Sequence, residues 1–180
     1  IMGAAGTSTK TRVPLPGAVS IVMTPPRRAV RSRMLRRPSP PHPMPDHPSI
    51  RLRTVLFADL RGSTSLYETL GNAAATTVVT RNVDELSRIV RAHRGQVVKT
   101  LGDGLMAVFG APLPLRDPCA GAVRTALEMI ETIELFNLER VAADKPQIRI
   151  GIGIASGEMV AGYAGTNERA TYTCIGDTVN

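Results

Sequence analysis

The chain contains no tryptophan, and phenylalanine and tyrosine together make up only 3% of its 180 residues. With 43% hydrophobic residues a core can still form, but it must be largely aliphatic. Cysteine is also scarce: Cys119 and Cys174 are too few for a disulfide scaffold, which fits a reducing compartment. No apolar run approaches the ~20 residues that cross a bilayer. We therefore expect a cytoplasmic domain, on its own or as the cytosolic part of a larger membrane-associated protein.

Most of the chain has no net charge, although the whole carries a formal charge of +7. Residues 1–50 hold eight lysines or arginines and one acid, Asp46, whereas residues 51–180 hold fourteen basic and fourteen acidic residues. The positive charge therefore belongs to the N-terminal segment. The rest of the chain gives no electrostatic reason to bind DNA or RNA, so we expect no nucleic-acid partner.

Residues 1–49 contain ten of the fourteen prolines and six arginines clustered between residues 27 and 37. Proline at this density removes backbone donors and fixes φ, so neither a helix nor a sheet is expected to propagate. We predict a disordered tail or linker over residues 1–49 and one folded domain over residues 50–180.

From Ile50 onward the hydrophobic periodicity predicts regular elements. Apolar and alternating runs predict strands at 50–58, 97–101, 105–109 and 147–155, and a further hairpin of 158–164 and 170–175. Apolar residues spaced by three and four predict helices at 72–94 and 123–141, after a short helical turn at 66–70. Asn72 is expected to cap the first long helix and Gly95 to end it. The order β, α, β, β, α, β is ferredoxin-like, so we predict an α+β fold with helices on one face of an antiparallel sheet.

Two aspartates follow segments that are predicted to be strands. Asp59 stands at the exit of the first strand, and Asp103 lies at the tip of the hairpin between residues 97 and 109. Taken singly, Asp59 reads as a helix cap and Asp103 as a turn acid, which are ordinary uses of aspartate. If the strands pair, their backbones lie ~4.8 Å apart and the carboxylates meet. Such a pair repels, and two divalent cations would remove that repulsion and favour phosphoryl transfer.

Three separated motifs in the sequence resemble the motifs of a known family. The first is Phe-Ala-Asp-Leu-Arg-Gly-Ser-Thr at 57–64, the second Lys-Thr-Leu-Gly-Asp at 99–103, and the third Tyr-Thr-Cys-Ile-Gly-Asp-Thr-Val-Asn at 172–180. Together, in this order, they resemble the catalytic domain of the class III adenylyl and guanylyl cyclases. The resemblance covers roughly residues 50–180, and Ser63 departs from the phenylalanine that many members carry. It implies the palm fold of that family.

The resemblance implies a two-metal site. Asp59 and Asp103 correspond to the metal ligands, the carbonyl of Leu60 assists at one ion, and the cofactors are two Mg²⁺ or Mn²⁺ per site. The backbone amides of the segment that follows the strand correspond to those that hold the terminal phosphates. This segment comprises Leu60, Arg61, Gly62, Ser63 and Thr64.

The resemblance also implies which base is bound. Lys99 and Thr173 correspond to the base-recognition positions, and lysine with threonine there favours adenine, so ATP is the expected substrate. Cys174 lies one place beyond the cysteine of the guanine type. Asn180 corresponds to the asparagine that orients the ribose in the transition state.

Two further features of the family bear on completeness and assembly. An arginine four places after Asn180, and a later lysine, lie beyond the end of this sequence, so we expect the catalytic domain to be incomplete at its C-terminus. The resemblance implies a homodimer in which one protomer holds the metals and the other supplies Lys99, Thr173 and Asn180.

The sequence therefore favours an adenylate cyclase that forms 3′,5′-cyclic AMP and pyrophosphate from ATP. A guanylate cyclase is the alternative enzyme. A non-catalytic nucleotide-binding or regulatory module is the alternative from another class, because the transition-state arginine is missing. The alternating strand at residues 147–155 carries glycines on one face, which further predicts close approach of another backbone or a ligand there.

Overall fold

The computed structural model describes residues 11–14, 20–24, 50–166 and 169–179. The elements are β1 Thr11–Pro14, β2 Ser20–Thr24, β3 Ile50–Arg61, α1 Ser63–Leu70, α2 Asn72–Ala92, β4 Gln96–Leu101, β5 Gly104–Phe109, α3 Pro118–Ala142, β6 Arg149–Thr166 and β7 Arg169–Ile175. The sequence predictions for the rest of residues 1–49 and for Asn180 fall outside these described residues.

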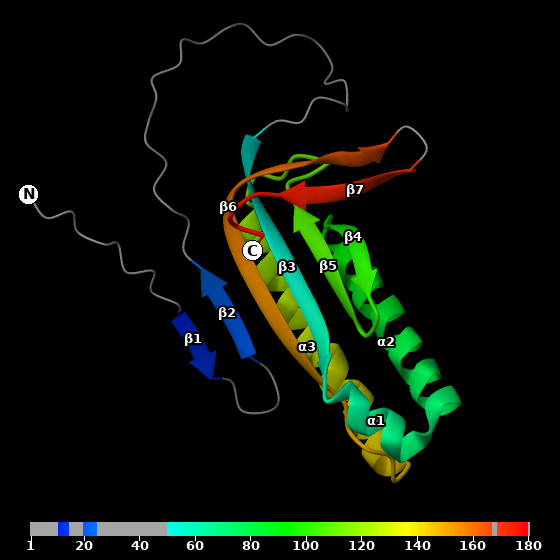
Figure 1. Cartoon of the computed structure of the whole chain (residues 1–180). Helices are drawn as coiled ribbons and strands as arrows, with labels where there is room; N and C mark the ends of the chain where they lie inside the picture. Colours follow the sequence, from blue (N-terminus) through cyan, green and yellow to red (C-terminus); the bar gives the residue numbers. More distant parts are fainter. Residues whose placement is uncertain (1–10, 15–19, 25–49, 167–168, 180) are drawn as a thin grey trace, which may run out of the picture.

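The strands form one sheet in the order β1-β2-β6-β3-β5-β4, and β7 pairs with the C-terminal part of β6. Within it β6, β3, β5 and β4 are antiparallel neighbours, and the helices enter after β3 and after β5. Figure 1 shows α2 and α3 behind this sheet, on one side of it. The predicted ferredoxin-like βαββαβ arrangement, an α+β fold, is confirmed.

Each face of the sheet has its own hydrophobic cluster. The larger cluster joins the sheet to the helices, with Leu56, Leu86 and Met129 fully buried in it. The smaller cluster contains no helical residue, and we call this side of the sheet the open face. Its buried members are Val55, Met106, Val108, Ala111, Met159, Ala161 and Cys174. The helices therefore cover one face only, as predicted.

The prediction that no sheet forms in the N-terminal segment is wrong at β1 and β2. These strands pair antiparallel with each other, and β2 runs parallel to β6 at Ile152–Ala155. The physical reason lies in the spacing of the prolines, because residues 20–24 are a β-branched run that contains none. Pro14 closes β1 at the outer edge of the sheet, where a missing N–H is tolerated.

Several predicted boundaries also differ. The two strands expected at 147–155 and 158–164 are one continuous strand, because Ser156 Oγ bonds Thr54 Oγ1 at 2.7 Å and the pairing with β3 continues through Gly157. Asn72 is the first residue of α2 and Gly71 is its N-cap. The left-handed residue after α2 is Arg94, with φ 62°, not Gly95. Gly95 serves another purpose, since a Cβ there would lie 2.6 Å from the ring of Phe109.

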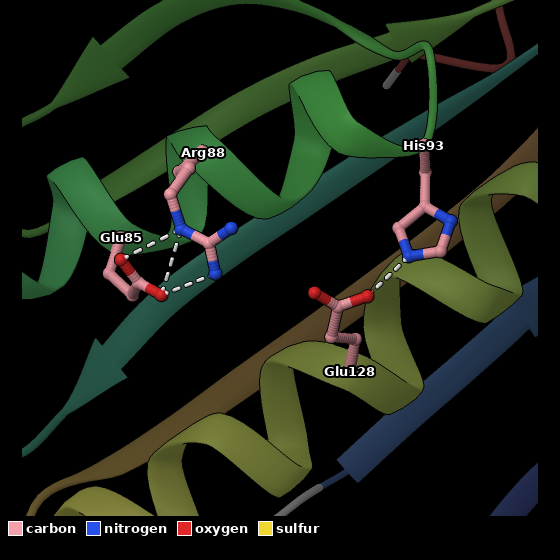
Figure 2. Close-up of polar contacts among 4 residues, drawn as sticks. All are labelled: Glu85, Arg88, His93 and Glu128. Atoms are coloured by element: carbon pink, nitrogen blue, oxygen red, sulfur yellow. Dashed lines mark hydrogen bonds and ion pairs between the residues drawn. The ribbon is translucent and has the colours of Figure 1, made fainter.

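Figure 2 shows two polar contacts of the helices, one between α2 and α3 and one within α2. His93 Nε2, at the end of α2, lies 2.6 Å from Glu128 Oε2 on α3, so this pair links the two helices. Glu85 and Arg88 pair at 2.7 Å within α2 and are largely exposed, so this ion pair adds little stability. No helix among the described residues is long and apolar enough to span a bilayer.

Phe109 is expected to be a main contributor to stability. Its side chain is completely buried and packs against Gly95 and Gly121, whose missing side chains make room for the ring. Phe109→Ala should lower the free energy of unfolding by about 3 to 5 kcal/mol, measured by urea denaturation. Leu113→Ala, at a residue that is 63% exposed, is the control and should change it by less than about 0.5 kcal/mol. Equal losses in the two variants would contradict this account.

Candidate active site

Asp59 and Asp103 converge at the end of β3. Asp59 stands directly opposite Gly104, the residue after Asp103, and the Leu60 amide donates to the Asp103 carbonyl oxygen at 3.4 Å. Although Asp59 is exposed to solvent, the surrounding protein partly desolvates its carboxylate, and this desolvation, followed by the charge of Asp103 and a hydrogen bond with it, raises the pKa of Asp59 above its usual value. Two acids that are 44 residues apart in sequence therefore meet, and the charge of Asp103 disfavours the ionised form of Asp59.

Glycines flank Asp59 on both neighbouring strands. A Cβ on Gly104 of β5 would lie 2.6 Å from both the Ala58 carbonyl oxygen and Asp59 Oδ1. On the other side Asp59 faces Gly151 of β6, over which Arg61 lies, with Nε 3.0 Å from the position of a Cβ. The close neighbour at Gly151 is thus a side chain, whereas the glycine pattern predicts another backbone or a ligand. The absence of a side chain at position 104 therefore leaves room for the Asp59 carboxylate.

The donor set fits a hard divalent cation. Asp59 is exposed and Asp103 is half-buried, so both carboxylates can be reached from solvent. They provide oxygen and no thiolate or imidazole, which is the chemistry that Mg²⁺ and Mn²⁺ prefer. Nearby positive charge would also relieve the repulsion that raises the pKa of Asp59. Among the described residues no cluster of three or more His, Cys, Asp or Glu offers an alternative metal site.

The predicted phosphate segment spans the junction of β3 and α1. Leu60 and Arg61 end the strand, and Gly62 adopts a left-handed φ of 70° as the N-cap of α1 without a side-chain cap. The Leu60 amide is already bonded to Asp103, which leaves the amides of Arg61 to Thr64 as the candidates. The first amides of a helix lack partners within the helix and carry a partial positive charge.

A cavity of about 490 Å³ opens beside this segment. It is lined by Leu60, Arg61, Gly62, Ser63, Ser65, Leu66, Thr69, Pro146, Gln147, Ile148 and Arg149. Arg61 and Arg149 stand directly opposite each other on β3 and β6, an arrangement that like charges disfavour. Neither has a side-chain hydrogen bond or ion pair elsewhere in the described part of the chain. An anion between them would relieve this repulsion.

Arg149 lines this cavity, and sequence reasoning did not select it as a candidate. It is a single arginine at the start of a strand and belongs to none of the three motifs. The alternation of β6, which places Arg149 on the same face as Gly151, could have drawn attention to it. Its position opposite Arg61 depends on the register of β3 against β6, which no local pattern reveals.

Lys99 and Thr173 lie on strands other than the one that carries Asp59, at different distances along the sheet. Thr173 pairs with Gly162 of β6 and Asp59 with Gly151, eleven residues away, which is roughly 35 Å of strand. Lys99 is exposed on β4 and pairs with Met106 of β5, whose partner on β3 is Phe57, two residues before Asp59. Thr173 therefore lies farther along the sheet from Asp59 than Lys99 does.

Cys174 is a packing residue. It belongs to the open-face cluster, and burial raises the pKa of its thiol to about 11, so it stays protonated at neutral pH. This agrees with the sequence interpretation that it does not read a base. Asn180, the predicted ribose contact, lies just beyond the described residues.

Residues 46–180 match the family described as the adenylate and guanylate cyclase catalytic domain. Among curated relatives, an uncharacterized protein of Mycobacterium tuberculosis is 38% identical over 70% of this chain and 21% of its own length. Adenylate cyclase 1 of Rhizobium meliloti is 33% identical over 71% of this chain and 19% of its own. The match thus spans about a fifth of these relatives.

Solved structures with this fold include both nucleotide specificities. The adenylyl cyclase CyaB from P. aeruginosa superposes with a TM-score of 0.68 at 28% identity, covering 74% of this chain and 69% of that one. A guanylyl cyclase superposes with a TM-score of 0.66 at 31% identity, covering 73% of this chain and 67% of that one. The likeness therefore does not separate ATP from GTP.

Proposed function

Because the chain belongs to the adenylate and guanylate cyclase catalytic domain family, we propose that it is the catalytic part of an adenylate cyclase. The substrate is ATP, and the products are 3′,5′-cyclic AMP and pyrophosphate. The observation that carries the proposal is the convergence of Asp59 and Asp103 at the end of β3, where the segment that follows lines a cavity together with Arg149. We place the reaction in the cytoplasm, in keeping with the free cysteines Cys119 and Cys174.

In the proposed reaction the ribose 3′-oxygen forms a bond to the α-phosphorus, and the bond from that phosphorus to the bridging oxygen breaks. Pyrophosphate leaves with the electron pair, and the 3′-hydroxyl proton passes to solvent. Two divalent cations, when bound, supply Lewis acidity at the attacking oxygen and the phosphates. Asp59, Asp103 and the Leu60 carbonyl would hold these cations. The amides from Arg61 to Thr64 bind the terminal phosphates.

We propose that the site is completed by a second copy of the chain. The register supports this arrangement, because Thr173 pairs with Gly162, eleven residues along β6 from Gly151, the partner of Asp59. In a symmetric dimer the metal ligands of one protomer would meet Lys99, Thr173 and Asn180 of its partner. The open face is the surface we assign to this contact, since Phe57, Val98 and Tyr172 remain partly exposed around its apolar cluster.

The test of the proposal is direct. Full-length protein incubated with ATP and Mn²⁺ should form cyclic AMP, detected chromatographically. Formation of cyclic GMP from GTP alone would favour the guanylate cyclase, a specificity that a structural neighbour has. Tight binding of ATP and Mn²⁺ without any product would instead favour a regulatory nucleotide-binding module.

Base choice gives a separate prediction. Lys99 donates to an acceptor nitrogen of adenine, whereas a glutamate there would accept from the N–H groups of guanine. Lys99→Glu with Thr173→Cys should therefore change the ratio of kcat/KM for ATP and GTP by at least about 10-fold in favour of GTP. The control is Arg124→Glu, at an exposed position on α3 that does not line the cavity. An unchanged ratio would remove these two residues from base recognition.

Arg149 gives another prediction. If its guanidinium meets the terminal phosphates across from Arg61, Arg149→Gln should raise KM for ATP about 10-fold or more, because a charged hydrogen bond is lost. Arg124→Gln, at an exposed position on α3, is the matched control and should leave KM unchanged. A KM that rises equally in the two variants would indicate a general loss of positive charge.

A further inference from the structure

The turn that follows β7 packs directly on the backbone of β6. A Cβ on Gly157 would overlap Thr178 Oγ1 and lie 3.2 Å from Thr178 Cβ and Cγ2. A Cβ on Gly176 would lie 3.0 Å from the Glu158 carbonyl oxygen and 3.2 Å from Met159 Cα. The turn itself is closed by a hydrogen bond from the Val179 amide to the Gly176 carbonyl oxygen at 2.9 Å. Two glycines therefore allow turn and strand to touch.

This contact lies on the open face. Gly157 has the same parity along β6 as Met159, which belongs to the open-face cluster, and Val179 packs against that cluster. The turn thus crosses β6 before the chain reaches Asn180. Its path is fixed at Thr178, two residues earlier, by the absence of a side chain at position 157.

We propose that Gly157 is a positioning residue for the C-terminal motif. By letting Thr178 lie against β6, it sets the direction in which the chain reaches Asn180. The inference rests on the proposed function, in which Asn180 orients the ribose at the partner's metals. Gly157 thereby acts on the site of the other protomer, although it is remote from the metal ligands of its own.

The first test compares two glycines of the same strand and face. Gly157→Ala should lower kcat about 100-fold, because a displacement of about 1 Å at a reacting group costs that much. KM for ATP and the affinity for Mn²⁺ should not change. Gly153→Ala is the matched control, since a Cβ there meets nothing within 4 Å, and it should behave as the unmodified protein. Equal kcat values in the two variants would overturn the proposal.

The second test is rescue. Thr178→Ala removes the Oγ1 and Cγ2 atoms that a side chain at position 157 would strike. Adding Thr178→Ala to Gly157→Ala should restore most of the lost kcat, although Thr178→Ala alone gives no gain. Losses that simply add would show that Gly157→Ala acts elsewhere.

The third test asks which protomer is affected. In mixed dimers with Asp59→Asn and Gly157→Ala on different protomers, one site keeps all its residues and about half the activity should remain. With both substitutions on the same protomer each site is damaged and activity should be nearly lost. The opposite order would mean that Gly157 acts on the site of its own protomer.

The last test does not depend on catalysis. Hydrogen exchange at the Val179 amide should be faster in Gly157→Ala than in Gly153→Ala, because the turn is lifted from β6. Equal exchange rates overturn the proposal even if the protein makes cyclic AMP. Faster exchange in a protein that makes no cyclic nucleotide would retain the contact and reject the proposed function.

Discussion

Replacing either Asp59 or Asp103 by asparagine is expected to lower cyclic AMP formation by at least about 100-fold, comparable to the loss of a main transition-state contact. The stability of the fold should respond in the opposite direction. Repulsion from Asp103 contributes to the raised pKa of Asp59, so the ionised pair costs stability at neutral pH. Asp59→Asn should therefore leave Tm unchanged or higher when divalent cations are removed.

Because activity is expected to fall while Tm stays the same or rises, this prediction can be distinguished from simple unfolding of the variant. Activity is measured as cyclic AMP formed per minute, Tm by circular dichroism in EDTA, and metal affinity by titration with Mn²⁺. Asp84→Asn, at an exposed carboxylate on α2, is the matched control and should change none of them. A large drop in Tm together with activity would mean that Asp59 is a structural residue, and unchanged activity would remove the carboxylate pair from the mechanism.

The sequence predicts well those features that depend on residues close together in the chain. Asp59 at the exit of a strand and Asp103 at a hairpin tip can be read from local signals, and the structure brings them together. The helices of the βαββαβ order also follow from a 3.6-residue period. Their ends are less certain, since Arg94 rather than Gly95 takes the left-handed conformation after α2.

What the sequence could not predict depends on long-range register. Gly151 and Gly153 look alike in the alternating strand, yet a side chain at Gly151 would meet Arg61 and one at Gly153 would meet nothing. Arg149 becomes a site residue only because β3 and β6 place it opposite Arg61. The pairing of β2 with β6 likewise joins residues more than a hundred positions apart. Such contacts are decided by the packing of the whole sheet.

Gly104→Ala is expected to have an effect as large as the loss of a carboxylate, by a different route. The added Cβ would lie 2.6 Å from the Ala58 carbonyl oxygen and Asp59 Oδ1, and 3.2 Å from Asp59 Cα. Two of these atoms belong to the backbone of the central strand β3, which cannot rotate away as a flexible side chain can. We therefore expect a loss of about 3 kcal/mol in the free energy of unfolding. Activity should fall at least about 100-fold, because β3 carries Asp59.

Gly162→Ala provides the control, since a Cβ at that position on β6 meets nothing within 4 Å and should be tolerated. Urea denaturation gives the stability change, and Mn²⁺ titration at a temperature where both variants are folded gives the metal affinity. If the folded Gly104→Ala protein binds Mn²⁺ normally, the clash is absorbed without moving Asp59. Weakened Mn²⁺ binding in the folded state instead means that Gly104 holds the Asp59 carboxylate in place, because in this variant both acids are still present and only their geometry has changed.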